Sequence, residues 1–142
     1  MERFLAFDAT QNGKGFNYGD GKTDRYYVEG WKNKEQYLSW QFRSIYPKPQ
    51  KFKVIIKYLA PAATCGGSYS IILDRNNPVS GKEVYRSEHL VTTDIKSTTV
   101  ITKVLDNISL EWGTYTLKIA PEIIAKAELM KLLEIQLIPS DK

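Results

Sequence analysis

The stretch Tyr26–Leu73, YYVEGWKNKEQYLSWQFRSIYPKPQKFKVIIKYLAPAATCGGSYSIIL, decides the fold class because apolar and polar residues alternate along much of it. One alternating run contains Leu38, Trp40 and Phe42, and a second contains Phe52, Val54, Ile56 and Tyr58. A period of two is typical of strands with one face toward a core and one toward water. The stretch therefore predicts successive strands, with Trp40, Phe42, Phe52, Val54 and Ile56 in the core.

Strand signals continue on both sides of this stretch. We expect strands at residues 4–8, 25–30, 37–44, 52–60, 68–74, 83–91, 97–105, 108–112 and 115–119. Residues 10–24 are rich in Gly, Asn and Asp and indicate a long ordered loop. The tail after Pro121 has strong helix formers but also alternates toward Pro139, and consistency with the preceding strands favours a closing strand. About nine strands in one domain, residues 1–142, predict an all-β fold: an antiparallel two-sheet β-sandwich or jelly roll.

Charge and cysteine content narrow the class of partner. The chain has 142 residues and a formal net charge of +4, and its 20 basic residues are spread among 16 acidic ones. Spread charge favours a solvated surface over a nucleic-acid-binding stripe.

Cys65 is the only cysteine, so no intrachain disulfide or cysteine-based zinc site can form. No apolar run reaches the roughly 20 residues that span a bilayer. MERFLAFDAT is no secretion leader. We expect neither a nucleic-acid nor a membrane partner.

The sequence contains no motif for catalysis. His89 is the only histidine, and none of the carboxylates lies in a motif that would set the pKa of one against another. Asp20 and Asp24 lie in an oxygen-rich turn that lacks the ligand spacing of a calcium loop, so a solvated turn is the preferred interpretation. We therefore expect no catalytic residue, no metal site and no cofactor, with structural calcium as the alternative at this turn.

Six motifs, in order, carry a resemblance that covers nearly the whole chain. They are AFDA, GWKNKEQYLSW, KFKVIIKYLAP, GSYSIIL, EWGTYTLKIAP and ELMKLLEIQLIP. In this order they resemble the galactose-binding-like β-sandwiches, similar to carbohydrate-binding modules, that accompany bacterial glycoside hydrolases. The closest similarity is to the C-terminal modules of α-L-fucosidase-type enzymes. The resemblance implies a final strand and a carbohydrate ligand.

The resemblance also implies a place for the sugar. It places Trp31 near the position of a sugar-stacking aromatic, which suits the apolar face of a pyranose ring. The residues around Trp31 leave a second role open, in which its side chain plugs the end of the sandwich. Its implied neighbours at the carbohydrate site are Tyr26, Tyr27, Lys32, Asn33 and Glu35. Trp112, beside Gly113 at a predicted hairpin tip, is the second aromatic expected to be exposed.

Two functions remain open at this stage. The first is a non-catalytic accessory domain of a glycoside hydrolase, such as an α-L-fucosidase, that binds carbohydrate weakly. The alternative is a structural sandwich that packs against and stabilises the catalytic domain without binding sugar. The segment VTTDIKSTT supports the alternative, because it has no Trp or Tyr where the resemblance implies a second stacking aromatic. As part of an exported bacterial hydrolase, the chain would be periplasmic or extracellular.

Overall fold

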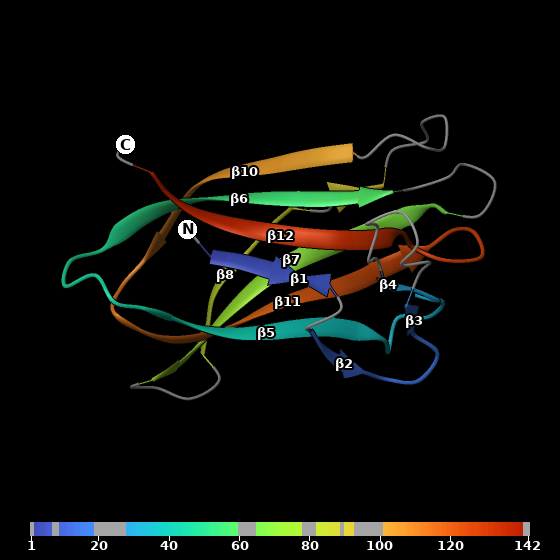
Figure 1. Ribbon diagram of the computed structural model, residues 1–142, viewed down its shortest axis with the longest axis horizontal. Coiled ribbons are helices and arrows are strands. Elements are labelled where there is room, and N and C mark those ends of the chain that lie inside the picture. Colours follow the sequence, from blue (N-terminus) through green and yellow to red (C-terminus); the bar gives the residue numbers. More distant parts are fainter. Residues whose placement is uncertain are drawn as a thin grey trace.

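The computed structural model describes residues 2–6, 9–18, 28–59, 65–77, 82–88, 90–92 and 101–140. In these ranges the chain forms twelve strands in two antiparallel sheets (Figure 1). The strands are β1 (Glu2–Leu5), β2 (Thr10–Asn12), β3 (Asn17–Tyr18), β4 (Val28–Glu29), β5 (Tyr37–Ser44), β6 (Gln50–Leu59), β7 (Gly67–Asn77), β8 (Lys82–Arg86), β9 (Leu90–Val91), β10 (Ile101–Leu110), β11 (Gly113–Ile124) and β12 (Lys131–Ser140). The predicted all-β, two-sheet class is confirmed.

The first sheet has the strand order β10-β6-β12-β4-β3, with β1 also paired to β12. The second has the order β2-β5-β11-β7-β8, with β9 also paired to β7. Two connections cross between the sheets at one end of the sandwich, which we call the hairpin end: residues 45–49 join β5 to β6, and residues 111–112 join β10 to β11. The opposite end, here the loop end, contains residues 30–36 and 125–130 (Figure 1).

The core lies between the sheets and is built from the alternating residues. The five residues predicted for it from the two alternating runs are all buried. The second sheet contributes buried side chains to this core from β7 and β11. They are Tyr69, Ile71 and Leu73 of β7 and Leu117 and Ile119 of β11. β11 buries every second side chain, whereas β7 is buried at each position from Ser68 to Leu73. One continuous core joins both sheets.

The closing strand is confirmed, whereas two other expectations need correction. β12 pairs with β6 over most of its length, so the tail ends as a strand. The segment 10–24 is not simply a loop, since it contains the short strands β2 and β3, and residues 19–24 lie outside the described ranges. The two strands expected at 97–105 and 108–112 form the single strand β10, whose register shifts between Leu105 and Ile108. The sequence pattern at this register shift within β10 was therefore interpreted as a boundary between two strands.

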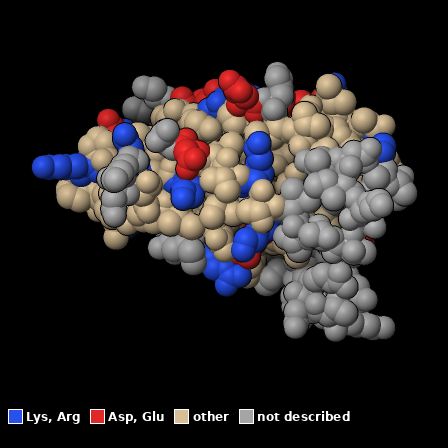
Figure 2. All heavy atoms as spheres, turned by 90° about the horizontal axis from the view of Figure 1, so that it is seen from above, with Lys and Arg blue, Asp and Glu red and all other residues tan. Residues whose placement is uncertain are grey.

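The surface carries mixed charge. In Figure 2, basic and acidic side chains lie in separate small groups among uncharged residues. This agrees with the interleaving of both signs along the chain. Among the residues described, no helix has the length and hydropathy needed to cross a bilayer.

Candidate functional site

The loop end holds most of the residues that the sequence placed at a sugar site. The chain leaves β4 at Gly30, whose φ of 83° lies in the left-handed region that glycine adopts without strain. This turn sends the Trp31 side chain into the core, where it is 0% exposed. Its Nε1 donates to the carbonyl oxygen of Gln36 at 2.8 Å, and its ring meets the edge of Phe16 at 5.5 Å.

The burial of Trp31 decides between the two roles that the sequence left open, in favour of a plug at the end of the sandwich. A stacking platform must expose a ring face to the sugar, and Trp31 exposes none. The indole instead fixes the position of the turn at residues 32–35. A role for Trp31 at a carbohydrate site would therefore be to support its neighbours.

The buried side chain of Gln36 hydrogen-bonds the backbone of this turn on its core side. Its buried side-chain Oε1 accepts from the backbone nitrogens of Lys32 at 2.5 Å and Asn33 at 3.0 Å, and its Nε2 donates to the Gly30 carbonyl at 3.0 Å. The Asn33 Oδ1 accepts from the backbone nitrogens of Glu35 and Gln36, both at 3.1 Å. Such side-chain-to-backbone bonds replace the pairing that a turn lacks. The turn is thus held in one conformation from both sides.

A charged cluster joins the turn to the start of β12. Lys131 Nζ donates to Glu29 at 2.6 Å and to Glu128 at 3.0 Å. The second carboxylate oxygen of Glu128 accepts from the Gly30 backbone nitrogen at 2.9 Å. Burial lowers the pKa of Lys131, but its bonds to the two carboxylates raise it further, so the net pKa is raised and the ammonium stays charged. The cluster therefore fixes β4, the turn and β12 to one another.

The outer side of the turn presents polar groups to solvent. Lys32, Asn33 and Glu35 are all exposed. Within the described residues, the amide nitrogen of Asn33 has no hydrogen-bond partner, because the turn uses only its oxygen. This surface offers ammonium and amide donors beside a carboxylate acceptor, which is a set that can bind a ligand rich in hydroxyl groups.

The other residues predicted for the site lie outside the described ranges. These are Tyr26 and Tyr27. His89, Asp20 and Asp24, which the sequence did not assign to the site, also lie outside these ranges. In the described part of the chain, no group of three or more His, Cys, Asp and Glu side chains could hold a metal ion. The structure thus brings Lys32, Asn33 and Glu35 together above Trp31.

Two features of the hairpin end stand apart from this site. Trp112 is 50% exposed there, as its place beside Gly113 predicted. A hollow of about 390 Å³ also opens between the sheets at this end. Sequence reasoning missed it, because its walls come from three strands whose residues look like ordinary core positions. The inward-facing Ser44 at the end of β5 was the signal available.

Comparison with known proteins was made at the level of sequence and of structure. No protein-family model matches the sequence, and no curated protein matches it significantly. Among solved structures, a family 35 carbohydrate-binding module from Clostridium thermocellum matches with a TM-score of 0.68 and 15% identity, covering 97% of this chain and 98% of that one. The chain shares the fold of this family 35 module. The resemblance to carbohydrate-binding β-sandwiches is therefore confirmed as a likeness of fold.

Two further matches show this fold in other settings. A GH26-CBM35 β-(1,4)-mannanase from Podospora anserina matches with a TM-score of 0.67 and 14% identity over 99% of this chain, which spans 28% of the length of that protein. A module described as Xyl-CBM35 in complex with a disaccharide containing glucuronic acid matches with a TM-score of 0.62 and 16% identity, covering 96% of this chain and 91% of that one.

Proposed function

We propose that this chain is a non-catalytic accessory module that binds carbohydrate beside the catalytic domain of a glycoside hydrolase. The observation that carries the proposal is the nearly complete mutual coverage with a carbohydrate-binding module at a TM-score of 0.68. The mannanase that contains the same fold supports a catalytic partner. The module bound to a disaccharide supports a sugar ligand.

The proposed contact surface is the exposed side of the turn at the loop end. Lys32, Asn33 and Glu35 would hydrogen-bond sugar hydroxyls, with Tyr26 and Tyr27 as the adjoining aromatics. Trp31 would act from below by holding the turn in place. Few direct contacts on a convex turn favour weak binding, because much of the sugar stays in water.

The parent enzyme and its location are finer parts of the proposal. The ordered motifs from AFDA to ELMKLLEIQLIP support an α-L-fucosidase-type parent from a bacterium. A module that binds polysaccharide would act in the periplasm or outside the cell. We propose neither a nucleic-acid partner nor a membrane partner.

The structural alternative is favoured by exposed apolar residues at the hairpin end. Ile45 is 69% exposed and Trp112 is 50% exposed on the two connections that cross between the sheets. Exposed large side chains of this kind suit contact with another domain. In this alternative the module stabilises the catalytic domain and leaves its affinity for substrate unchanged.

Calorimetric titration of the whole chain with oligosaccharides tests the proposal. We expect millimolar dissociation constants that weaken at least about threefold in Asn33→Ala and Glu35→Ala, since each removes a hydrogen bond to sugar. Lys48→Ala, an exposed change at the hairpin end, is the matched control and should leave binding at the turn intact. Unchanged binding in both turn variants would contradict this site, and no heat with any glycan would favour the structural alternative.

A further inference from the structure

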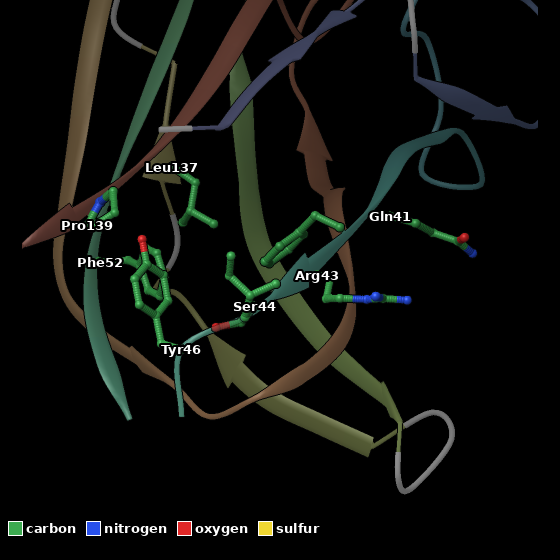
Figure 3. Close-up of a pocket in the computed structure, with 9 residues that line it drawn as sticks. Gln41, Arg43, Ser44, Tyr46, Phe52, Leu137 and Pro139 are labelled. Carbon is green, nitrogen blue, oxygen red and sulfur yellow. The ribbon is translucent and has the colours of Figure 1, made fainter. Parts of the chain in front are cut away.

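The hollow at the hairpin end is built from both sheets. Figure 3 shows side chains from three strands converging on it. Its lining includes Phe42 and Ser44 of β5, Phe52 of β6, Leu137 and Pro139 of β12, and Tyr46 on the connection to β6. At about 390 Å³, and with polar and apolar surface in nearly equal shares, it has the size of a small-molecule site.

Ser44 gives the hollow a polar group without a partner. Its side chain faces inward at the end of β5 and is only 2% exposed. Among the residues that the structure describes, its hydroxyl has no hydrogen-bond partner, although buried hydroxyls in folded proteins nearly always have one. Figure 3 shows this oxygen directed toward the side where Tyr46 and Phe52 lie. A ligand hydroxyl that enters the hollow would supply the missing partner.

The aromatic walls are held in place by ring contacts. The rings of Tyr46 and Phe52 meet edge to face at 5.9 Å, and Phe42 stacks on Tyr115 at 5.4 Å. Tyr46 is the half-buried ring among these, so it can pack against the apolar face of a sugar ring with little loss of side-chain freedom on binding.

The rim of the hollow carries polar donors and leads to a second depression. Gln41 and Arg43 point outward from β5, and within the described residues Arg43 forms no ion pair. A shallow depression of about 630 Å³ shares Gln41 and Arg43 with the hollow and continues over the outer face of the second sheet, where it is lined by Asn76, Thr114 and Thr116. The rim therefore joins the hollow, with its aromatic walls, to a surface of amides and hydroxyls.

We propose that the hairpin-end hollow is a second carbohydrate site, which takes the terminal pyranose residue of a glycan. The ring packs against the half-buried Tyr46, and one of its hydroxyls bonds the Ser44 hydroxyl. The next sugar residue lies over the rim, where Gln41 and Arg43 donate to its oxygens. The ligand class rests on the proposed carbohydrate function, but the place is new, because this hollow lies at the opposite end of the sandwich from the turn at residues 32–35.

Two sites at opposite ends have a consequence for avidity. One module could hold two glycan chains, or two points of one insoluble polysaccharide, at once. Binding to the solid polymer would then exceed the affinity for a soluble disaccharide at either site.

Nuclear magnetic resonance of the whole ¹⁵N-labelled chain locates the binding. The probes are mannobiose and a disaccharide containing glucuronic acid, titrated into the millimolar range. The expected result is a set of shift changes at the amides of Phe42, Ser44 and Tyr46, separate from any set at Lys32, Asn33 and Glu35. Changes at the turn alone would overturn the second site and leave the proposed function standing. Changes at the hollow alone would support the second site and overturn the binding role of the turn, and none at either end would overturn both.

Substitution of two buried serines then tests the role of the Ser44 hydroxyl. In Ser44→Ala, affinity at the hollow should fall about three- to tenfold. The melting temperature should stay the same or rise, because the hydroxyl removed has no partner within the described part of the chain. Ser87→Ala is the matched control. Its Oγ accepts from the Ile71 backbone nitrogen and donates to the Glu88 carbonyl, both at 2.9 Å, so its loss should lower the melting temperature and leave affinity at the hollow unchanged. A lower melting temperature in Ser44→Ala with unchanged affinity would overturn the proposal.

Discussion

At the scale of single residues, Gly67 shows how closely the backbone of this sandwich is packed. It begins β7 with a φ of 140°, opposite an irregularity in β11 near Ile123. A Cβ at this position would lie 1.9 Å from the Ile123 carbonyl oxygen, so both backbone conformation and space require glycine. The adjacent Gly66 has neither constraint, because a Cβ there would meet only the Lys126 side chain at 3.4 Å.

Gly67→Ala should therefore destabilise the chain strongly. We expect a loss of at least about 2 kcal/mol in the free energy of unfolding, since the backbone of β7 or β11 must move. Gly66→Ala, the matched control, should change it by less than about 1 kcal/mol in either direction. Urea unfolding followed by circular dichroism measures both, and equal losses would contradict the geometry at Gly67.

Gln36→Ala should loosen the turn of the candidate site. The change leaves the backbone groups of Gly30, Lys32 and Asn33 without the partners that Gln36 supplies. We expect a loss of about 2 kcal/mol in the free energy of unfolding, because partly buried polar groups become unpaired. Glu35→Ala is exposed and should cost less than about 0.5 kcal/mol. A stable Gln36→Ala variant would show that the turn is held by other contacts.

At the scale of elements, the sequence predicted the long strands and missed the short strands β2 and β3. β5 and β6 alternate over eight and ten residues, which is long enough for a period of two to be visible. β2 and β3 have three and two residues, too few for any period. These strands exist because neighbouring strands offer them pairing partners, and that information is not local.

The candidate site shows the same division between local and distant information. The sequence placed exposed polar residues at 32–35, but not the burial of Trp31. That burial depends on Phe16 and on Glu128, which lies 98 residues from Gly30 along the chain. A single aromatic flanked by glycine and lysine has the same local pattern whether it plugs a core or lies on the surface.

An ion pair between β1 and β12 makes the pairing of these strands depend on pH. Arg3 donates to Glu134 through Nε at 2.9 Å and through a second nitrogen at 3.3 Å. Burial raises the pKa of Glu134, but the bond and charge of Arg3 lower it further, so the net pKa is below its usual value. A carboxyl whose pKa is lowered by folding stabilises the fold above its unfolded pKa and loses that contribution as the pH falls through its folded pKa.

Arg3→Met should therefore destabilise the protein at neutral pH and have less effect as the pH falls below about 4. Unfolding in urea between pH 7 and pH 3 measures the difference from the unmodified chain. Arg43→Met is the control, since Arg43 has no ion pair within the described ranges, and its effect should be similar at each pH. A constant effect of Arg3→Met across this range would contradict the role of the pair.

At the scale of the whole molecule, the three tryptophans report on both ends and on the middle of the sandwich. Trp31 at the loop end is 0% exposed, Trp40 in the core is 6% exposed and Trp112 at the hairpin end is 50% exposed. Acrylamide should therefore quench mainly the fluorescence of Trp112. Trp112→Phe should remove most of the accessible component, whereas Trp31→Phe should leave it in place. An accessible component that disappears in Trp31→Phe would restore Trp31 as an exposed binding residue.

The position of β12 in the first sheet has a consequence for how this molecule is made. β12 pairs with β6 on one side and with β1 and β4 on the other, yet it is the last of these strands to leave the ribosome. Until residue 140 has emerged, β1 and β4 lack this partner and one side of β6 is an open edge. Such an edge can pair with another chain, so the period between synthesis of β6 and arrival of β12 is when the nascent protein is most exposed to aggregation.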